Sequence, residues 1–246
     1  MGMPKVRLFV PDALAADADL AVSGKPAHYL LHVMRLSVGD AVRVFNGRHG
    51  EWRASLAGRG RSDCHLRVEA PWREQRGEPG PWLAFAPLKK DAQDLLIAQA
   101  TELGVERLLP VLTRFTAAER ISLERLRAQT IEAAEQSERL TVPAIAEPRP
   151  LPALLAAWPF ERQLLFADER GGLPFAEAVR CISPPPGLLV GPEGGFSVEE
   201  RTDLVARPFV TTVGLGPRIL RAGTAAVAAL ACWQALCGDW HKPPRE

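Results

Sequence analysis

The stretch GLLVGPEGGFS, residues 187–197, decides the fold of the C-terminal part of this chain. Its apolar start predicts a buried strand over residues 187–191, and the glycines after it predict a tight loop. Ser197 and Glu200 have the spacing of a capping box, which predicts a helix over residues 197–206. A glycine loop between a buried strand and a capped helix is typical of a ligand site at the carboxyl end of a parallel strand.

A second glycine loop, GLGPRILR at residues 214–221, follows an expected strand over residues 209–213. Its glycines let a ligand approach the backbone around the apolar Leu215, which suits an adenine held by backbone hydrogen bonds. Arg218 and Arg221 are three residues apart and share one face if this stretch is helical. They suit an RNA phosphate or a developing base anion, and a surface salt bridge is the alternative.

From residue 82 onward strands alternate with helices, which predicts an α/β domain with a doubly wound, mostly parallel sheet covered on both faces. Strands are expected over residues 82–88, 108–112, 163–167, 187–191 and 209–213. Helices are expected over residues 91–104 with Asp91 as N-cap, 122–137, 174–180, 197–206 and 224–237. The first strand ends in Lys-Lys-Asp, residues 89–91, rather than Gly-x-Gly, which argues against a dinucleotide fold and the usual methyltransferase fold.

The N-terminal third has shorter elements than the rest of the chain. Short strands over residues 6–10, 41–46, 52–56 and 66–70, with one helix over residues 28–36, predict a small barrel or sandwich. Residues 71–81 are rich in proline and glycine and are expected to form a linker. The sequence therefore predicts one domain over residues 1–72 and a second over residues 78–246.

Charge is unevenly distributed along the chain. Residues 1–76 hold 12 Lys and Arg against 8 Asp and Glu, and nearly all of these cations are arginines. Arginine is well suited to phosphate and to stacking on bases, so this part is a candidate for nucleic-acid binding. A solvated basic surface is the alternative.

Composition excludes several classes of protein. A hydrophobic fraction of 47% and a net charge of +1 are incompatible with a disordered chain. The longest apolar stretch, residues 222–237, is interrupted by polar residues and glycine and is shorter than a span of about 20 apolar residues, so we expect a buried helix and no membrane partner. The four cysteines match no zinc or disulfide pattern, which favours a reducing cytoplasm and no metal.

Together, the two glycine loops and Thr224-Ala225 resemble the SPOUT methyltransferases, and within them most closely the bacterial 16S rRNA uridine-N3 methyltransferases. Further blocks resemble the same family and extend the resemblance over nearly the whole chain: Arg7–Val10, His28, Val33–Leu36, Phe45–Gly47, Thr101–Val105 and Ala133–Ser137. The chain departs from the family pattern at three positions: Gln99 in place of Lys, Glu138 in place of Gly and Gly223 in place of Glu.

The resemblance implies a fold and an activity. The fold is a small PUA-like β-barrel that binds RNA, followed by a sheet whose C-terminal part is threaded into a trefoil knot. The activity is S-adenosylmethionine-dependent methylation of N3 of a uridine in 16S rRNA within the 30S subunit, with uridine 1498 as the family target. The family forms homodimers, and the apolar helix over residues 224–237 suits either a dimer interface or ordinary core.

The resemblance also gives candidate site residues. Arg218 and Arg221 are the candidates for stabilising the uracil anion or fixing phosphate, and the general base is not identified. The candidates for holding the cofactor are Leu165, Phe166, Ala167, Gly191, Glu193, Gly194, Gly195, Leu215, Gly216, Ile219, Leu220 and Thr224. The candidates for RNA binding are Arg7, His28, Arg35, Arg43 and Arg48. Two other functions stay open: a SPOUT enzyme that modifies a ribose 2′-hydroxyl or another base, and a ribosome-binding assembly protein without catalysis.

Overall fold

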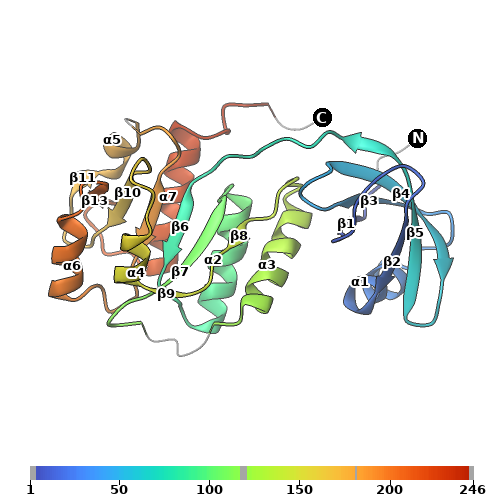
Figure 1. The fold of residues 1–246 in the computed structure, drawn as a ribbon, viewed down its shortest axis with the longest axis horizontal. Helices are drawn as coiled ribbons and strands as arrows, with labels where there is room; N and C mark the ends of the chain where they lie inside the picture. The colour runs from blue at the N-terminus through green and yellow to red at the C-terminus, as the bar shows by residue number, and fades with distance from the viewer. Residues whose placement is uncertain (1–3, 117–120, 181, 244–246) are drawn as a thin grey trace. The chain divides into compact units, whose positions relative to one another are not determined.

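The computed structural model describes residues 4–116, 121–180 and 182–243, and the chain divides into two compact units (Figure 1). Unit 1 consists of Met1–Glu78 together with Ala134–Val142. Unit 2 consists of Pro79–Ala133 and Pro143–Glu246. Unit 1 is therefore assembled from two pieces of chain that are more than fifty residues apart in the sequence.

Unit 1 is built on a five-stranded sheet with the order β1-β3-β4-β5-β2. The strands are β1 (Arg7–Phe9), β2 (Asp19–Ser23), β3 (Ala41–Phe45), β4 (Glu51–Arg59) and β5 (Asp63–Arg73). β1 and β3 run parallel, and the other neighbours run antiparallel. Side chains alternate along β5, so Cys64, Leu66 and Val68 point into the core while their neighbours are exposed.

A short helical segment completes unit 1. The α-helix α1 (Gly24–His28) continues directly into a single π-helical stretch, η1 (Tyr29–Val33). Ala27, Leu30 and Leu31 from this segment are buried against the sheet. The expected helix over residues 28–36 therefore exists but begins four residues earlier and ends three residues earlier.

Two other features of unit 1 differ from the sequence-based expectation. β5 extends to Arg73 and enters the expected linker, because Pro71 pairs with Trp52 at an irregularity of the β4–β5 ladder and needs no donor there. β2 was not expected, since its five residues bury only Leu20 and Val22 and give too short an alternation to stand out.

Unit 2 contains a parallel sheet with the strand order β11-β13-β10-β12-β6-β7-β8, and β9 pairs with β7. Every strand pair of this sheet that the structure describes is parallel. The long strands are β6 (Trp82–Phe85), β7 (Arg107–Leu112), β10 (Leu164–Ala167), β12 (Gly187–Val190) and β13 (Val210–Gly214). The two-residue strands β8 (Ala144–Ile145), β9 (Arg149–Pro150) and β11 (Leu173–Pro174) were not expected, because two residues carry no periodicity.

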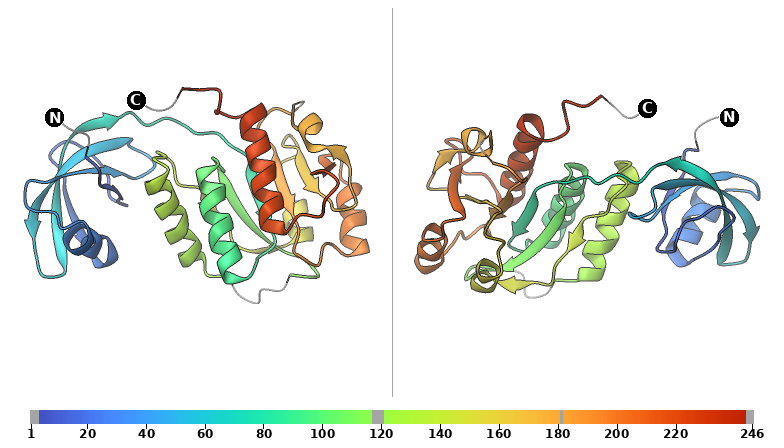
Figure 2. Two further views of the ribbon diagram at one scale, coloured as in Figure 1. Left: turned by 180° about the vertical axis from the view of Figure 1, so that it is seen from behind. Right: turned by 45° about the horizontal axis from the view of Figure 1, so that its top comes forward.

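Helices cover both faces of this sheet (Figure 2). One face packs against α2 (Lys90–Glu102), α5 (Phe175–Arg180) and α7 (Ala222–Leu236). The opposite face packs against α4 (Leu151–Ala156) and α6 (Val198–Val205). α3 (Leu123–Gln136) starts in unit 2, where Leu126 joins the core, and its last residues belong to unit 1. The doubly wound α/β fold is thus confirmed.

Local signals for helices had mixed success. Ser197 and Glu200 form the expected capping box, with Ser197 Oγ accepting from Glu200 N at 3.2 Å. Asp91 is not an N-cap, because α2 begins one residue earlier than expected and Lys89 occupies the cap position without a side-chain bond. Helix α4 was missed, since its six residues are too few for a helical period to emerge. Among the described residues, no helix is long and apolar enough to cross a membrane.

Candidate functional site

The main cavity of unit 2 lies at the carboxyl ends of four neighbouring strands. Its volume is about 940 Å³. Most of its wall comes from the ends of β6, β10, β12 and β13 and the segments that follow them: residues 87–92, 166–170, 190–196, 215–216 and 218–222. The carboxyl edge of a parallel sheet is where such folds bind ligands, because the loops there leave the sheet toward both faces.

The loop after β12 is held in one conformation by packing and caps. A Cβ added to Gly191 would overlap the Phe196 ring, so this position requires glycine. Gly195 has a φ of 69°, a conformation that glycine adopts without strain, and its N–H donates to Pro192 O at 2.9 Å. Phe196 packs edge-on against Phe166 with ring centroids 5.0 Å apart. The loop therefore presents a fixed backbone surface to the cavity.

The loop after β13 supplies apolar and cationic groups. Leu215 and Leu220 are half-buried, whereas Ile219 is 83% exposed. Arg218 and Arg221 both line the cavity, although this stretch is not helical and Arg221 is only the N-cap of α7. The condition under which these arginines would share a helix face is therefore not met, and the course of the loop brings both to the cavity.

Most of the expected cofactor residues do line this cavity: Phe166, Ala167, Gly191, Glu193, Gly194, Gly195, Leu215, Gly216, Ile219 and Leu220. Leu165 does not, because alternate residues of β10 face opposite sides of the sheet and Leu165 is buried against α2, α5 and α7. Thr224 does not line it either. Ala222 and Ala225, three residues apart in α7, face the cavity, and Thr224 lies on another face of that helix.

Charged groups that sequence reasoning did not assign to the site also line the cavity. The Asp168 side chain, only 4% exposed, forms an ion pair with Arg201 of α6 and accepts from Arg170 N at 3.0 Å. Glu169 lies beside Gly195, and its carboxylate would be 3.3 Å from a Cβ added there. Asp168 and Glu169 directly follow the expected strand over residues 163–167. Their position at the carboxyl end of a parallel strand therefore indicates that they belong to the site.

Cations are grouped with these carboxylates. Lys89 and Lys90 line the cavity from the end of β6 and the start of α2, and both are exposed. Sequence analysis used this Lys-Lys-Asp stretch only as evidence against a dinucleotide fold, because it lacks glycine, and did not predict its place in the cavity. The cavity thus combines apolar walls, backbone-exposing glycines and side chains of both charges, which suits a ligand that carries both charges itself.

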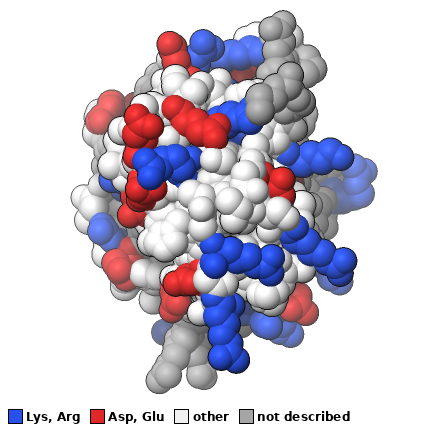
Figure 3. All heavy atoms as spheres, turned by 90° about the vertical axis from the view of Figure 1, so that its right-hand side faces the viewer, with Lys and Arg blue, Asp and Glu red and all other residues white. Residues whose placement is uncertain are grey.

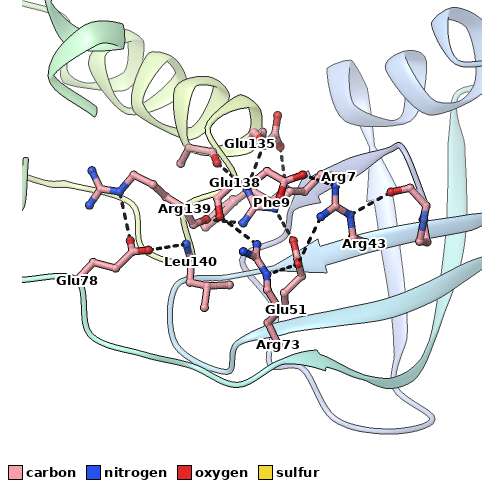
Figure 4. Close-up of polar contacts among 12 residues, drawn as sticks. Arg7, Phe9, Arg43, Glu51, Arg73, Glu78, Glu135, Glu138, Arg139 and Leu140 are labelled. Atoms are coloured by element: carbon pink, nitrogen blue, oxygen red, sulfur yellow. Dashed lines mark hydrogen bonds and ion pairs between the residues drawn. The ribbon is translucent and has the colours of Figure 1, made fainter. Parts of the chain in front are cut away.

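Two of the expected RNA-binding residues are buried in unit 1 (Figure 4). Arg7 donates to Glu51 Oε1 at 2.5 Å, and Glu51 is fully buried. Arg43 donates to Glu138 Oε1 at 2.7 Å and lies 3.7 Å from Glu51 Oε2. The assignment of Arg7 and Arg43 to RNA binding is therefore wrong, because their guanidinium groups are already paired and shielded from solvent.

These residues belong to an ion-pair cluster that ties the two pieces of unit 1 together. Arg73 donates to the other Glu51 oxygen, Oε2, at 2.7 Å and to the Glu138 carbonyl at 3.0 Å. Arg7 donates to the Ala134 carbonyl at 2.5 Å. The hydrogen bond from Arg43 is the main reason why the pKa of Glu138 lies below its ordinary value.

The other expected RNA-binding residues are exposed. The His28 ring lies against that of His32, with centroids 4.9 Å apart. Arg35 is exposed with a φ of 54°, and Arg48 donates to Pro11 O at 2.9 Å. Figure 3 shows lysine and arginine side chains projecting over the lower and right-hand parts of the face that it presents.

The three positions that depart from the family pattern lie in different surroundings. Glu138 has a φ of 58°, which explains why glycine suits this position, and it forms the ion pair with Arg43. Gly223 is in the first turn of α7 and has nothing within 4 Å of an added Cβ, so a larger side chain would fit. Gln99 is half-buried within α2.

In the part of the chain that the structure describes, no group of three or more His, Cys, Asp and Glu side chains could hold a metal ion. Cys64, Cys232 and Cys237 are free, and burial raises the pKa of Cys64 and Cys232. Cys181 lies outside the described residues.

Comparison with known proteins matches both units. A family model described as an RNA methyltransferase domain matches residues 79–234, and one described as an RNA methyltransferase PUA domain matches residues 22–69. The ribosomal RNA small subunit methyltransferase E of Rickettsia conorii is 32% identical over 231 residues, which cover 92% of this chain and 93% of that protein. This chain belongs to that RNA methyltransferase family.

Further relatives of this methyltransferase support the same family assignment. The protein of the same name from Synechocystis is 35% identical over 238 residues, covering 94% of this chain and 77% of that one. The crystal structure of a ribosomal RNA small subunit methyltransferase E from Neisseria gonorrhoeae, bound to S-adenosyl methionine, matches with a TM-score of 0.84. It is 25% identical, and the match covers 97% of this chain and all of that one. The expected SPOUT-like α/β fold with a PUA-like domain before it is thus confirmed.

Proposed function

We propose that this protein transfers a methyl group from S-adenosylmethionine to N3 of a uridine in 16S rRNA of the 30S subunit, with uridine 1498 as the target. The observation that carries the proposal is the cavity at the ends of β6, β10, β12 and β13, which both glycine loops line. It lies in a chain that matches the S-adenosyl methionine-bound Neisseria structure over nearly its full length.

The residues of the cavity fit the cofactor. A volume of about 940 Å³ accommodates a molecule of this size, since such sites measure roughly 300–1,000 Å³. The backbone of the loop after β13, with Leu215 and Leu220, suits the adenine. The carboxylates of Glu169 and Glu193 suit the positive charges of the cofactor's sulfonium and amino groups. The backbone at Gly194 and Gly195 carries no side chain, so the cofactor can approach it closely. When bound, the cofactor supplies a methyl group activated by its sulfonium.

The chain's own residues must deal with the charge on the uracil. N3 of uracil is an imide nitrogen, and its deprotonation spreads negative charge over the two neighbouring carbonyl oxygens. Arg218 and Arg221, which line the cavity, stabilise that anion. N3 lies on the base-pairing edge, so the uridine must be unpaired when it enters the site. Glu193 and Glu102 are carboxylates that could accept the N3 proton, and of the two only Glu193 lines the cavity.

The proposed architecture follows the same family. Unit 1, which contains residues 1–72, acts as the PUA-like RNA-binding domain, and unit 2 acts as the methyltransferase domain. Residues 134–142 therefore join the first domain, although the sequence-based boundaries place them in a domain over residues 78–246. The return of the chain from β13 through the loop of residues 215–221 to α7 is the proposed trefoil threading. The enzyme acts in the cytoplasm as a homodimer, with the apolar α7 as an interface element.

The deciding experiment is methyl transfer from labelled S-adenosylmethionine to 30S subunits that lack this modification, followed by nucleoside mass spectrometry. We expect 3-methyluridine. A methylated ribose or another methylated base would replace uridine N3 with another target. Absence of both transfer and cofactor binding would favour a non-catalytic assembly protein.

The roles of the arginines have a separate test. We expect Arg218→Gln and Arg221→Gln each to lower kcat by about 10²–10³, the usual effect of removing one donor to a developing anion. Cofactor affinity, measured by calorimetry, should change little. Arg207→Gln is the control, since Arg207 pairs with Asp203 in α6 and does not line the cavity. A raised KM for RNA with unchanged kcat would assign the arginines to phosphate binding instead.

A further inference from the structure

Unit 1 contains a smaller hollow of about 390 Å³, which we call the histidine notch. It is lined by Ser23, Gly24, His28, Leu31, His32, Arg61 and Ser62. These residues come from the end of β2, from α1 and η1, and from the turn between β4 and β5. The lining contains no carboxylate, so every charged or titratable side chain in it is a base.

Packing of the helical segment directs the two imidazoles into the notch. Ala27, Leu30 and Leu31 are at most 3% exposed and fix the inward side of the segment. His28 and His32 are one turn apart on its exposed side, with ring centroids 4.9 Å apart and an interplanar angle of 35°. The notch therefore has two neighbouring imidazoles held by a buried apolar anchor.

The opposite wall is the turn that joins β4 and β5. Gly60 N donates to Asp63 O at 2.9 Å and closes this turn around Arg61 and Ser62. Asp63 is paired with Ser23 in the β2–β5 ladder, which connects the turn to the rest of the lining. Within the described ranges, Arg61 and both imidazoles have no side-chain hydrogen bond or ion pair, so their N–H groups are free to bind a ligand.

We propose that the histidine notch binds a phosphate group of the RNA backbone. The guanidinium of Arg61, the imidazole N–H groups and the two serine hydroxyls are all donors, and they converge on one hollow without a competing acceptor charge. The part of the lining formed by Leu31 and Gly24 is apolar or without a side chain, which suits an adjoining ribose. The inference rests on the proposed function only in that RNA is the substrate.

Other ligand classes fit this notch less well. A metal cation would meet the positive charge of Arg61 and only two imidazole ligands, fewer than the three or four protein ligands of ordinary zinc sites. A base stacked on an imidazole would leave the donors of Arg61, Ser23 and Ser62 without an acceptor. A phosphate satisfies donors from both walls at once, and phosphate contacts position a protein on RNA without reading its sequence.

The test measures how binding depends on salt. Binding of labelled 16S rRNA transcript to the full-length protein is followed over a series of KCl concentrations, for wild type and Arg61→Gln. We expect Arg61→Gln to bind more weakly at every salt concentration and to lower the slope of log K against log salt by about one. Ser62→Asp, which places a carboxylate at the same turn, should weaken binding further.

Arg67→Gln is the matched control. Arg67 lies in β5, pairs with Asp19 and does not line the notch, so this variant should keep the wild-type slope. Each variant is first checked for its affinity for S-adenosylmethionine, which should match wild type because the notch and the cofactor cavity lie in different units. That check shows that unit 2 is folded, and a wild-type circular-dichroism spectrum and unfolding midpoint for each variant separate a loss of RNA binding from a loss of folding in unit 1.

The possible results are distinct. A wild-type slope and affinity in both Arg61→Gln and Ser62→Asp would overturn the proposal. Saturable shifts of the His28 and His32 imidazole NMR signals by inorganic phosphate alone, with RNA binding unaffected by the variants, would assign the notch to a free anion and also overturn it. Failure of methyl transfer by wild type would count against the proposed function, while the salt series would still decide the role of the notch.

Discussion

Single residues in the cavity have backbone conformations that restrict what can replace them. Gly195 has a φ of 69°, and a Cβ there would lie 3.3 Å from the Glu169 carboxylate. We expect Gly195→Val to lower cofactor affinity by more than about tenfold, or 1.4 kcal/mol, because the side chain strains the loop and obstructs the backbone surface. Isothermal titration calorimetry measures this loss.

Gly171→Val is the control for that experiment. Gly171 also has a positive φ, 96°, but has nothing within 4 Å of an added Cβ and does not line the cavity. It therefore introduces backbone strain without obstructing the site. If both variants lose affinity equally, or if neither does, our placement of the cofactor is wrong.

Glu138 combines an unfavourable backbone conformation with a side chain that forms an ion pair. Its φ of 58° costs energy, and its carboxylate forms an ion pair with Arg43. Because that pair lowers the pKa of Glu138 in the folded state, its stabilisation is fully present above the unfolded-state value of about 4.3 and is lost as pH falls through the folded-state pKa.

Comparison with Glu138→Gln tests this pH dependence. We expect wild type to be more stable than the variant by a constant amount at neutral pH, and the difference to shrink below about pH 4.3. Urea unfolding over a pH series measures the free energies, and Glu69→Gln, which affects an exposed pair with Arg53, serves as control. A difference that grows on acidification would contradict the assignment.

Residue identity alone did not predict burial in this cluster. Arg7 and Arg43 resemble RNA-binding arginines by type, but Glu51 and Glu138, which pair with them, are distant in the sequence. A pairing across such separations exists only after the sheet has formed. By contrast, the glycines and arginines at strand ends do line one cavity, because a strand end fixes its own position relative to the sheet.

At the scale of elements, the capping box connects a helix to the ligand loop. Ser197 Oγ accepts from Glu200 N, and the Glu200 carboxylate accepts from both Ser197 N and Arg114 N. We expect Ser197→Ala to cost about 1 kcal/mol of stability and to speed amide hydrogen exchange in the first turn of α6 and in residues 191–196. Hydrogen exchange followed by mass spectrometry resolves these segments.

Thr202→Ala in the same helix is the control, because the Thr202 hydroxyl only bonds back to Val198 O. Exchange in the ligand loop should stay at its wild-type rate in this variant. Equal acceleration in both variants would show that the cap does not act on the loop in particular.

Elements differed in how well the sequence predicted them. Long strands and helices of unit 2 are predictable because their apolar runs span several residues, as in β12 and α7. The π-helical stretch and the two-residue strands were not, since pairing partners rather than local sequence define them. Exact boundaries, such as the start of α2 at Lys90, depend on caps that side chains do not always mark.

At the scale of the whole molecule, unit 1 is built from two separate pieces of chain, and this arrangement predicts how the protein behaves after cleavage. Residues 134–142 belong to unit 1 and are held by hydrogen bonds from Arg7 and Arg73. If a protease site is inserted at Gly77, which has open space around it, we expect the two fragments to remain together on size-exclusion chromatography after cleavage. Ordinary domains joined by one linker would separate.

Disruption of the ion-pair cluster should release the fragments. Glu51→Gln leaves Arg7 and Arg73 without their buried carboxylate partner, a change that typically costs about 3–5 kcal/mol. Cleaved Glu51→Gln protein is therefore expected to elute as two species, whereas the exposed-pair control Glu69→Gln should not. Separation of the wild-type fragments would show that the cluster does not hold them.

The same division of unit 1 has a consequence during synthesis. When residue 78 has left the ribosome, the N-terminal sheet is complete, but residues 134–142 have not been made. At about 5–20 residues per second, translation needs several seconds to supply them. During that interval Arg7 and Arg73 lack the carbonyl groups of Ala134 and Glu138 that they bind in the finished protein. Part of the interior of the nascent unit 1 therefore stays exposed until the chain has grown past Val142.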